Sequence, residues 1–141
     1  MASDKTLHFG EFDLINTYFS RVNSSNRSTQ TFGKEVLLGI GDDCALLEGP
    51  PNNSILAVTT DMLVENRHFF RDANPTLLGH KSLAVNLSDL AAMGAKPIAY
   101  TLSLALPSID HTWLKGFSTG LHTLADRFEC SLIGGDTTAG P

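Results

Sequence analysis

The stretch IAYTLSLALPSIDHTWLKGFSTGLHTLADRFECSLIGG, residues 98–135, carries the clearest structural pattern in the chain. In its first part, Ile98 to Leu106, large apolar residues alternate with Thr101 and Ser103. This two-residue period is typical of a strand, because successive side chains of a strand point to opposite faces. Pro107 follows and ends the pattern. The sequence therefore predicts a strand over residues 98–106.

A long amphipathic helix is predicted next. Asp110 is placed to cap it, because an aspartate side chain can accept hydrogen bonds from the first free N–H groups of a helix. Apolar residues then recur at helical spacing, at Leu114, Phe117, Leu121, Leu124 and Phe128. Ser131 to Ile133 predicts a short strand, which runs into a loop at Gly134-Gly135-Asp136.

Four more elements, two helices and two strands, are predicted N-terminal to this stretch. Residues 77–93 lack proline, share a stripe of Leu83, Leu87 and Leu90, and are closed by Gly94, so we expect a largely buried helix. Residues 10–22 predict an amphipathic helix through Phe12, Ile15, Phe19 and Val22. Val36–Ile40 and Ile55–Thr60 predict buried strands. The element order favours an α/β or α+β layered domain.

Composition limits the classes of partner. The chain has 141 residues, 42% of them hydrophobic, which is enough for one domain with a real core. A net charge of −5 argues against a nucleic-acid surface, and no stretch is apolar enough to span a membrane. Cys44 and Cys130 have no metal or disulfide spacing, so we expect reduced cysteines and a cytoplasmic location.

Four short acidic motifs carry the chemical signal. They are Gly41-Asp42-Asp43, Thr59-Thr60-Asp61, Asn86-Leu87-Ser88-Asp89 and Gly134-Gly135-Asp136-Thr137. Each places carboxylate or hydroxyl oxygens beside a glycine or near the end of a predicted element. Such oxygens are the ligands that Mg²⁺ prefers, and phosphates bind through Mg²⁺. The motifs therefore predict a Mg²⁺-dependent phosphate site.

Each motif also has a plain structural interpretation. Asp42 and Asp43 can belong to a turn, since glycine and aspartate are turn residues. Thr59-Thr60-Asp61 can be a β-prone threonine pair followed by a solvated aspartate. Asp89 shares a helical stripe with Ser82 and Asn86, which can be an exposed polar face. If that stripe is buried instead, Asp89 needs Lys81, an amide donor or a cation as its partner.

Two further residues are candidates for ligand contact. Gly135 leaves room for a ligand to approach the backbone, although a single Gly-Gly-Asp motif is weak evidence. His68 is a candidate substrate contact, with a structural histidine as the alternative. The chain contains neither a P-loop nor a dinucleotide-binding fingerprint. Phosphates would then be held through aspartate-bound Mg²⁺, which an acidic protein tolerates.

Four stretches, in order, resemble bacterial thiamine-monophosphate kinases. They are GIGDDCALL (39–47), TTDMLVENRHF (59–69), LGHKSLAVNLSDLAAMGAKP (78–97) and LIGGDTTAGP (132–141). The GDD and GGD elements alone also suit the wider superfamily that includes aminoimidazole ribonucleotide synthetase, selenophosphate synthetase and a hydrogenase-maturation enzyme. The resemblance covers nearly the whole chain from Gly10 onward.

The resemblance implies an aminoimidazole ribonucleotide synthetase-like N-terminal domain of α/β (α+β) class. Such a domain has a mixed/antiparallel sheet with helices packed on one face. Residues 1–141 would form an N-terminal domain that binds ATP and Mg²⁺ and dimerises, with the C-terminal domain absent from this chain. The family's sheet pairs with that of its dimer mate to build a barrel, and ATP binds near the interface. A homodimer is thus implied.

The resemblance also assigns roles to individual residues. The positions that look like ligands of several Mg²⁺ ions are Asp43, Thr59, Thr60, Asp61, Asp89 and Asp136. Asp42 ranks below Asp43. Gly135 resembles an ATP-contacting position and His68 a position that contacts thiamine phosphate. Asn66 stands where the family pattern leads us to expect glycine, which puts the shape of the substrate loop in question.

The implied reaction is ATP-dependent phosphorylation of thiamine monophosphate to thiamine diphosphate. The acceptor is already an anionic phosphate, so no residue of this chain need act as a general base, and positioning with charge neutralisation carries catalysis. We expect residues 1–141 alone to turn over poorly. The alternatives are another ATP-dependent synthetase of the superfamily and a non-catalytic nucleotide-binding dimerisation domain.

Overall fold

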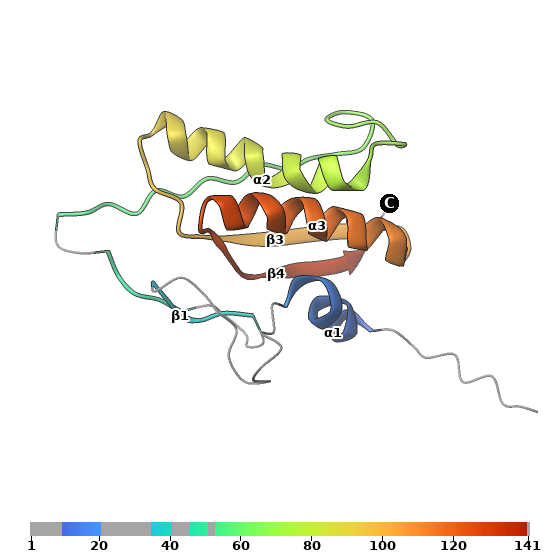
Figure 1. Cartoon of the computed structure of the whole chain (residues 1–141), viewed down its shortest axis with the longest axis horizontal. Helices are drawn as coiled ribbons and strands as arrows, with labels where there is room; N and C mark the ends of the chain where they lie inside the picture. Colours follow the sequence, from blue (N-terminus) through green and yellow to red (C-terminus); the bar gives the residue numbers. More distant parts are fainter. Residues whose placement is uncertain (1–9, 21–34, 41–45, 51–52, 141) are drawn as a thin grey trace, which may run out of the picture.

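The computed structural model describes residues 10–20, 35–40, 46–50 and 53–140. Asp42, Asp43 and Cys44 lie outside these ranges. Within them, no helix is long and apolar enough to cross a membrane. Figure 1 shows the elements, which are α1 (Glu11–Leu14), the π-helical turn η1 (Ile15–Phe19), β1 (Val36–Leu38), β2 (Leu46–Leu47), α2 (Pro75–Ala92), β3 (Ala99–Leu106), α3 (His111–Arg127) and β4 (Ser131–Ala139).

The β3–α3–β4 unit organises the fold. β3 and β4 pair in parallel, and α3 connects them. A parallel pair needs such a crossover, because the chain must return to the starting end before the second strand begins. The predicted strand over residues 98–106 is confirmed to within one residue. The predicted cap of α3 is confirmed too, because Asp110 Oδ1 accepts from the N–H groups of Thr112 and Trp113.

The second strand is longer than predicted. The sequence indicates a strand that stops at Ile133 before a loop, whereas Gly134, Gly135 and Asp136 continue β4 as far as Ala139. The pairing register shifts opposite Tyr100 and Thr101, where the glycine pair enters the strand. The loop prediction was wrong because glycines that suggest a turn also occur at bulges inside strands.

The predicted helix over residues 77–93 is confirmed as α2. Asn74 caps it, since its side-chain oxygen accepts from two backbone N–H groups, and Pro75 occupies the first turn. Leu83 and Leu87 are buried, as the stripe predicts. Much of the remaining helix surface is exposed, so the expectation of a largely buried helix holds for one face only.

Two glycines bring α2 and α3 into backbone contact. A Cβ atom added to Gly120 would lie 1.8 Å from the carbonyl oxygen of Thr76. One added to Gly79 would lie 2.0 Å from the carbonyl oxygen of Phe117. Both distances are far inside van der Waals contact, so any larger residue would push the helices apart. The pairing of α2 with α3 therefore depends on glycine at these positions.

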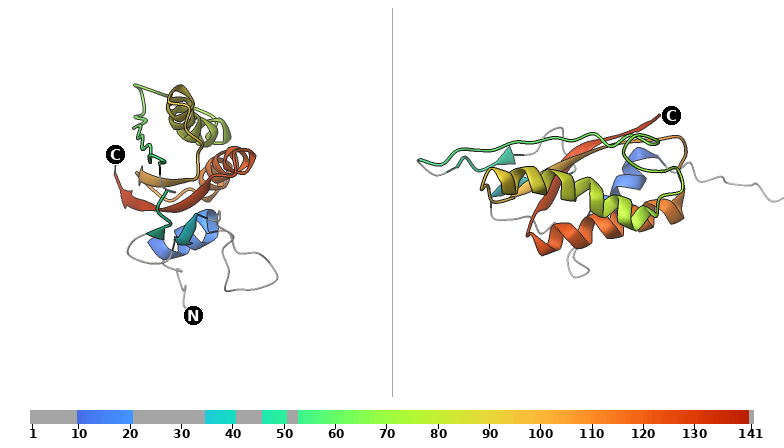
Figure 2. Two further views of the ribbon diagram at one scale, coloured as in Figure 1. Left: turned by 90° about the vertical axis from the view of Figure 1, so that its left-hand side faces the viewer. Right: turned by 90° about the horizontal axis from the view of Figure 1, so that it is seen from above.

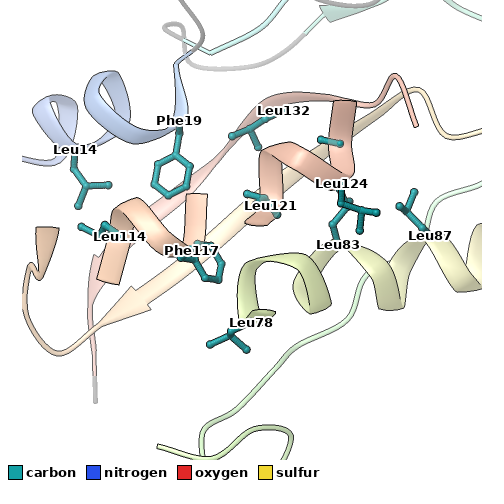
Figure 3. Close-up of a cluster of buried hydrophobic side chains, with 11 residues drawn as sticks. Leu14, Phe19, Leu78, Leu83, Leu87, Leu114, Phe117, Leu121, Leu124 and Leu132 are labelled. Atoms are coloured by element: carbon teal, nitrogen blue, oxygen red, sulfur yellow. The ribbon is translucent and has the colours of Figure 1, made fainter. Parts of the chain in front are cut away.

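The hydrophobic core surrounds α3. Leu114 and Leu121 of α3 are at most 1% exposed, and Figure 3 shows them among side chains from α1, η1, α2 and β4. The other labelled members of this cluster are Leu14, Phe19, Leu78, Leu83, Leu87, Phe117, Leu124 and Leu132. Burial of each large apolar side chain contributes about 2 kcal/mol. α3 is therefore the central element of the core.

The predicted stripe of the N-terminal helix is only partly confirmed: Phe19 is buried as predicted, but Leu14 is buried in place of Ile15. Leu14 and Phe19 are buried, whereas Ile15 is only half-buried. The π-helical turn from Ile15 to Phe19 changes the helical phase, because its hydrogen bonds span five residues rather than four. Residues five apart therefore reach the core together, and an α-helical stripe misplaces them.

The strands form two separate pairs. β1 and β2 are antiparallel, and β3 and β4 are parallel. The predicted strand at Ile55–Thr60 is wrong, because residues 54–64 belong to no assigned strand. We call residues 53–64 the exposed segment; Figures 1 and 2 show it running along the molecule beside α2. Within the described residues, the two strand pairs do not join into one mixed sheet.

Candidate functional site

Two of the predicted ligands meet across 30 residues of sequence. The Thr59 hydroxyl, on the exposed segment, donates a hydrogen bond to Asp89 Oδ2 on α2 at 2.9 Å. Asp89 is exposed and Thr59 is half-buried. Two oxygen-bearing side chains thus lie side by side at the surface, and a hydroxyl with a carboxylate is a ligand pair suited to a hard cation.

The other two residues of the polar stripe on α2, Ser82 and Asn86, form hydrogen bonds within the helix. The Ser82 hydroxyl donates to the carbonyl oxygen of Leu78, and the Asn86 amide donates to the carbonyl oxygen of Ser82. Both bonds stay within the helix, one turn back, which is a common pattern for such side chains. Asp89 is therefore the member of this stripe that reaches another segment of the chain.

The other predicted ligands that the structure describes form no carboxylate cluster with Asp89. Thr60 and Asp61 are exposed on the segment that carries Thr59. Asp136 is exposed on β4, where it pairs in register with Ser103. Among the described residues, no three His, Cys, Asp or Glu side chains come close enough to share an ion. Asp43 lies outside the described residues, so the full ligand set stays a prediction.

His68 sits in a tight loop whose hydrogen bonds orient its ring. We call residues 64–69 the His68 loop. The Val64 N–H donates to His68 Nδ1 at 3.0 Å, and the His68 N–H donates to the Val64 carbonyl at 2.8 Å. A nitrogen that accepts a hydrogen bond carries no proton, so the neutral ring carries its proton on Nε2. His68 is exposed, and its Nε2–H is the ring group left to meet a ligand.

Asn66 takes the backbone conformation that a glycine would favour. Its φ is 61°, in the left-handed region, and its N–H donates to the Phe69 carbonyl at 2.8 Å. Asparagine enters this region more readily than most residues do. The loop is therefore closed with asparagine in place of the glycine that the family pattern suggests.

Lys81 has a different partner from the one considered from sequence. Its ammonium group donates to the carbonyl oxygen of His68 and not to Asp89. The contact joins α2 to the His68 loop, 13 residues earlier in the chain. Sequence spacing cannot reveal this pairing, because the loop between the two residues sets it.

Gly135 has a structural role of its own. Its φ is 148°, and an added Cβ would lie 1.8 Å from the carbonyl oxygen of Leu102 on β3. Close strand approach therefore requires glycine here, whatever ligand the position meets. The proposed contact with ATP stays a prediction.

The buried thiol offers no reactive group. Burial raises the pKa of Cys130 from 9.0 to about 11. A thiol is nucleophilic only as the thiolate, and desolvation disfavours that form. Cys130 therefore behaves as a small core residue, in line with the expectation from sequence.

Most of the chain matches one known protein family. Residues 41–141 match the family described as "AIR synthase related protein, N-terminal domain". The match includes all of α2, β3, α3 and β4, and all four acidic motifs. It agrees with a fold that combines helices with a small parallel sheet.

Proteins with curated descriptions are similar over almost the whole chain. Thiamine-monophosphate kinase from Escherichia coli is 53% identical over 132 residues, which are 94% of this chain and 38% of that protein. The protein of the same name from Haemophilus influenzae is 49% identical, over 93% of this chain and 38% of its own length. The chain therefore spans about two fifths of the length of the curated relatives that it matches.

Solved structures support the same relationship. The crystal structure of thiamine-monophosphate kinase from Stenotrophomonas maltophilia matches with a TM-score of 0.69 and 51% identity, over 77% of this chain and 34% of that one. The one from Aquifex aeolicus matches with a TM-score of 0.56 and 32% identity, over 58% and 28%. Fold and sequence thus agree, and the chain belongs to the AIR synthase related protein family through that family's N-terminal domain.

Proposed function

We propose that the protein containing this chain is a thiamine-monophosphate kinase. It would transfer the γ-phosphoryl group of ATP to the phosphate of thiamine monophosphate, giving thiamine diphosphate and ADP. The observation that carries the proposal is identity of about one half, over 94% of the chain, with a protein of that name. All four acidic motifs also lie within residues 41–141, which match the family.

The proposed reaction needs little general acid–base catalysis. A phosphate oxygen of thiamine monophosphate attacks the γ-phosphorus, the bond from that phosphorus to the β,γ-bridging oxygen breaks, and ADP leaves with the bond electrons. Because the attacking oxygen is already ionised, positioning and charge stabilisation dominate. The task of this chain is therefore to hold two phosphate groups in line.

The described oxygens fit Mg²⁺. Asp89 Oδ2 and Thr59 Oγ1 lie 2.9 Å apart at the surface, and hydroxyl with carboxylate oxygens suits a hard cation. Bound Mg²⁺ would neutralise the phosphate oxygens that an acidic protein otherwise repels. Thr60 and Asp61, exposed on the same segment, are proposed to complete the ligand set with Asp43 and Asp136.

The exposed segment supports a homodimer. Ile55 is 95% exposed, Val58 83% and Met62 79%, although all three are apolar. Residues 54–64 also belong to no assigned strand. An apolar stretch that pairs with no strand of the described chain is suited to adding a strand from another chain. We propose that a second copy pairs here and completes the mixed/antiparallel sheet, with ATP near Gly135.

The proposal is tested by product formation. The full natural protein that contains these residues is incubated with ATP, Mg²⁺ and thiamine monophosphate, and thiamine diphosphate is measured by chromatography. We expect product only when all three are present. We also propose that the enzyme is cytoplasmic and that its cysteines are reduced. Absence of product with an intact, folded protein would contradict the proposal. Residues 1–141 alone are expected to give a much lower rate.

The breadth of the matched family also suits a second function. The family that matches residues 41–141 is broader than the kinases. Another ATP-dependent synthetase of that family would hydrolyse ATP only with a different phosphate or amide substrate. A non-catalytic nucleotide-binding domain would bind ATP but leave thiamine monophosphate unchanged. ATP turnover that requires thiamine monophosphate identifies the kinase, and turnover tested with other phosphate or amide substrates separates a synthetase from a non-catalytic domain.

A further inference from the structure

Two polar contacts tie the chain that precedes α2 to the surface of that helix. Thr59 reaches Asp89, and the carbonyl oxygen of His68 accepts from Lys81. The partners occur in opposite order along the sequence, so this part of the chain runs antiparallel to α2. Figure 1 shows it passing beside the helix and turning at the helix's N-terminal end. α2 therefore serves as the support for both contacts.

The helix sets the distance between the two contacts. Lys81 and Asp89 are eight residues apart, which corresponds to about 12 Å at 1.5 Å per residue. A helix is stiff over this length, whereas the exposed segment has no strand partner of its own. The spacing between Thr59 and His68 thus follows from α2 and not from the segment.

Three hydrogen bonds hold His68 in one orientation. Its backbone N–H and ring Nδ1 both pair with Val64, and its carbonyl oxygen accepts from Lys81. The bond from Lys81 is charge-assisted, which makes it stronger than a neutral one. It is also the bond that joins the loop to a stiff element, because Val64 moves with the loop itself.

We propose that Lys81 is a positioning residue for His68, and that His68 Nε2–H donates to a hydrogen-bond-accepting group of the substrate. This inference rests on the proposed function, because it takes thiamine monophosphate as the ligand. Lys81 does not touch the substrate in this account. It holds the His68 loop at a fixed distance from the Thr59–Asp89 pair. One end of the substrate can then reach His68 while the other end reaches that pair.

The test replaces Lys81 in the full natural protein. Lys81→Met removes the donor and keeps the length of the side chain, and Lys81→Arg retains a positive donor. We expect Lys81→Met to raise KM for thiamine monophosphate about tenfold while KM for ATP and kcat change by less than about twofold, because one positioning hydrogen bond is lost. Lys81→Arg should recover most of the loss. Lys115→Met, an exposed lysine on α3, is the matched control.

A second readout does not depend on activity. Amide hydrogen exchange in the full natural protein reports how firmly the His68 loop is held against α2. We expect the backbone N–H groups of Asn66 and His68 to exchange about tenfold faster in Lys81→Met than in the wild type, with circular dichroism unchanged, because the bond that joins the loop to the helix is lost. Unchanged exchange together with an unchanged KM would overturn the role of Lys81. If the wild type makes no thiamine diphosphate, the proposed function fails, and the exchange measurement still decides whether Lys81 holds the loop.

Discussion

The α2–α3 pair and the exposed segment with its His68 loop are held in opposite ways. The helices meet backbone to backbone at Gly79 and Gly120 and enclose leucines that are almost fully buried. The segment is apolar yet exposed, and polar contacts at Thr59 and His68 hold it to α2. Stability therefore resides in the helices. The candidate chemistry combines residues of the segment, which contributes little to stability, with Asp89 on α2.

The largest effect on stability should come from truncating the core. Leu114→Ala is expected to lower the free energy of unfolding by about 4 kcal/mol, because Leu114 is 0% exposed and its removal leaves a cavity. Ile55→Ala, at 95% exposure, should change it by less than about 0.5 kcal/mol. Denaturant unfolding of both variants provides the comparison. Equal losses would show that the segment is also part of the stable core.

A smaller loss is expected at the glycine pair of β4. Gly135→Ala should cost about 2 kcal/mol, because the new Cβ would meet the Leu102 carbonyl and the backbone φ is positive. Gly134→Ala is the control, since an added Cβ there has no neighbour within 4 Å. Thermal unfolding should separate the two. If both variants melted together, the close approach of β3 and β4 would not limit residue 135.

The smallest effect on stability should come from the contact that joins the two regions. Thr59→Val removes the hydroxyl but keeps the shape of the side chain, and its hydrogen bond to Asp89 lies at the surface. We expect a change of about 0.5 kcal/mol in unfolding free energy. Phosphoryl transfer should nevertheless fall about tenfold, because a proposed ligand is lost. Thr101→Val, at an exposed position of β3, serves as the matched control for removal of a hydroxyl.

The two regions also differ in how well sequence predicts them. Periodicity and capping identified β3, α2 and the start of α3, because these signals are local. Ile55–Thr60 has the composition of a strand, but composition does not specify a partner, and pairing decides whether a strand forms. The long β4 escaped prediction because its register shift depends on β3.

The site shows the same division. The motifs named Thr59 and Asp89 separately, yet only the fold shows that they touch. Lys81 appeared as a possible partner for Asp89, and its actual contact with His68 depends on the path of the loop. Residue types and family patterns thus propose the chemistry, while the contacts between distant segments require the structure.

The most direct test of the account is to measure kinase rate and unfolding free energy together for Asp89→Asn in the full natural protein. Asparagine keeps an oxygen that can accept from Thr59 but loses the charge that a cation needs. The account predicts a fall in thiamine diphosphate formation of about a hundredfold, with the free energy of unfolding changed by less than about 0.5 kcal/mol. An unchanged rate, or a loss of rate that merely follows unfolding, would contradict it.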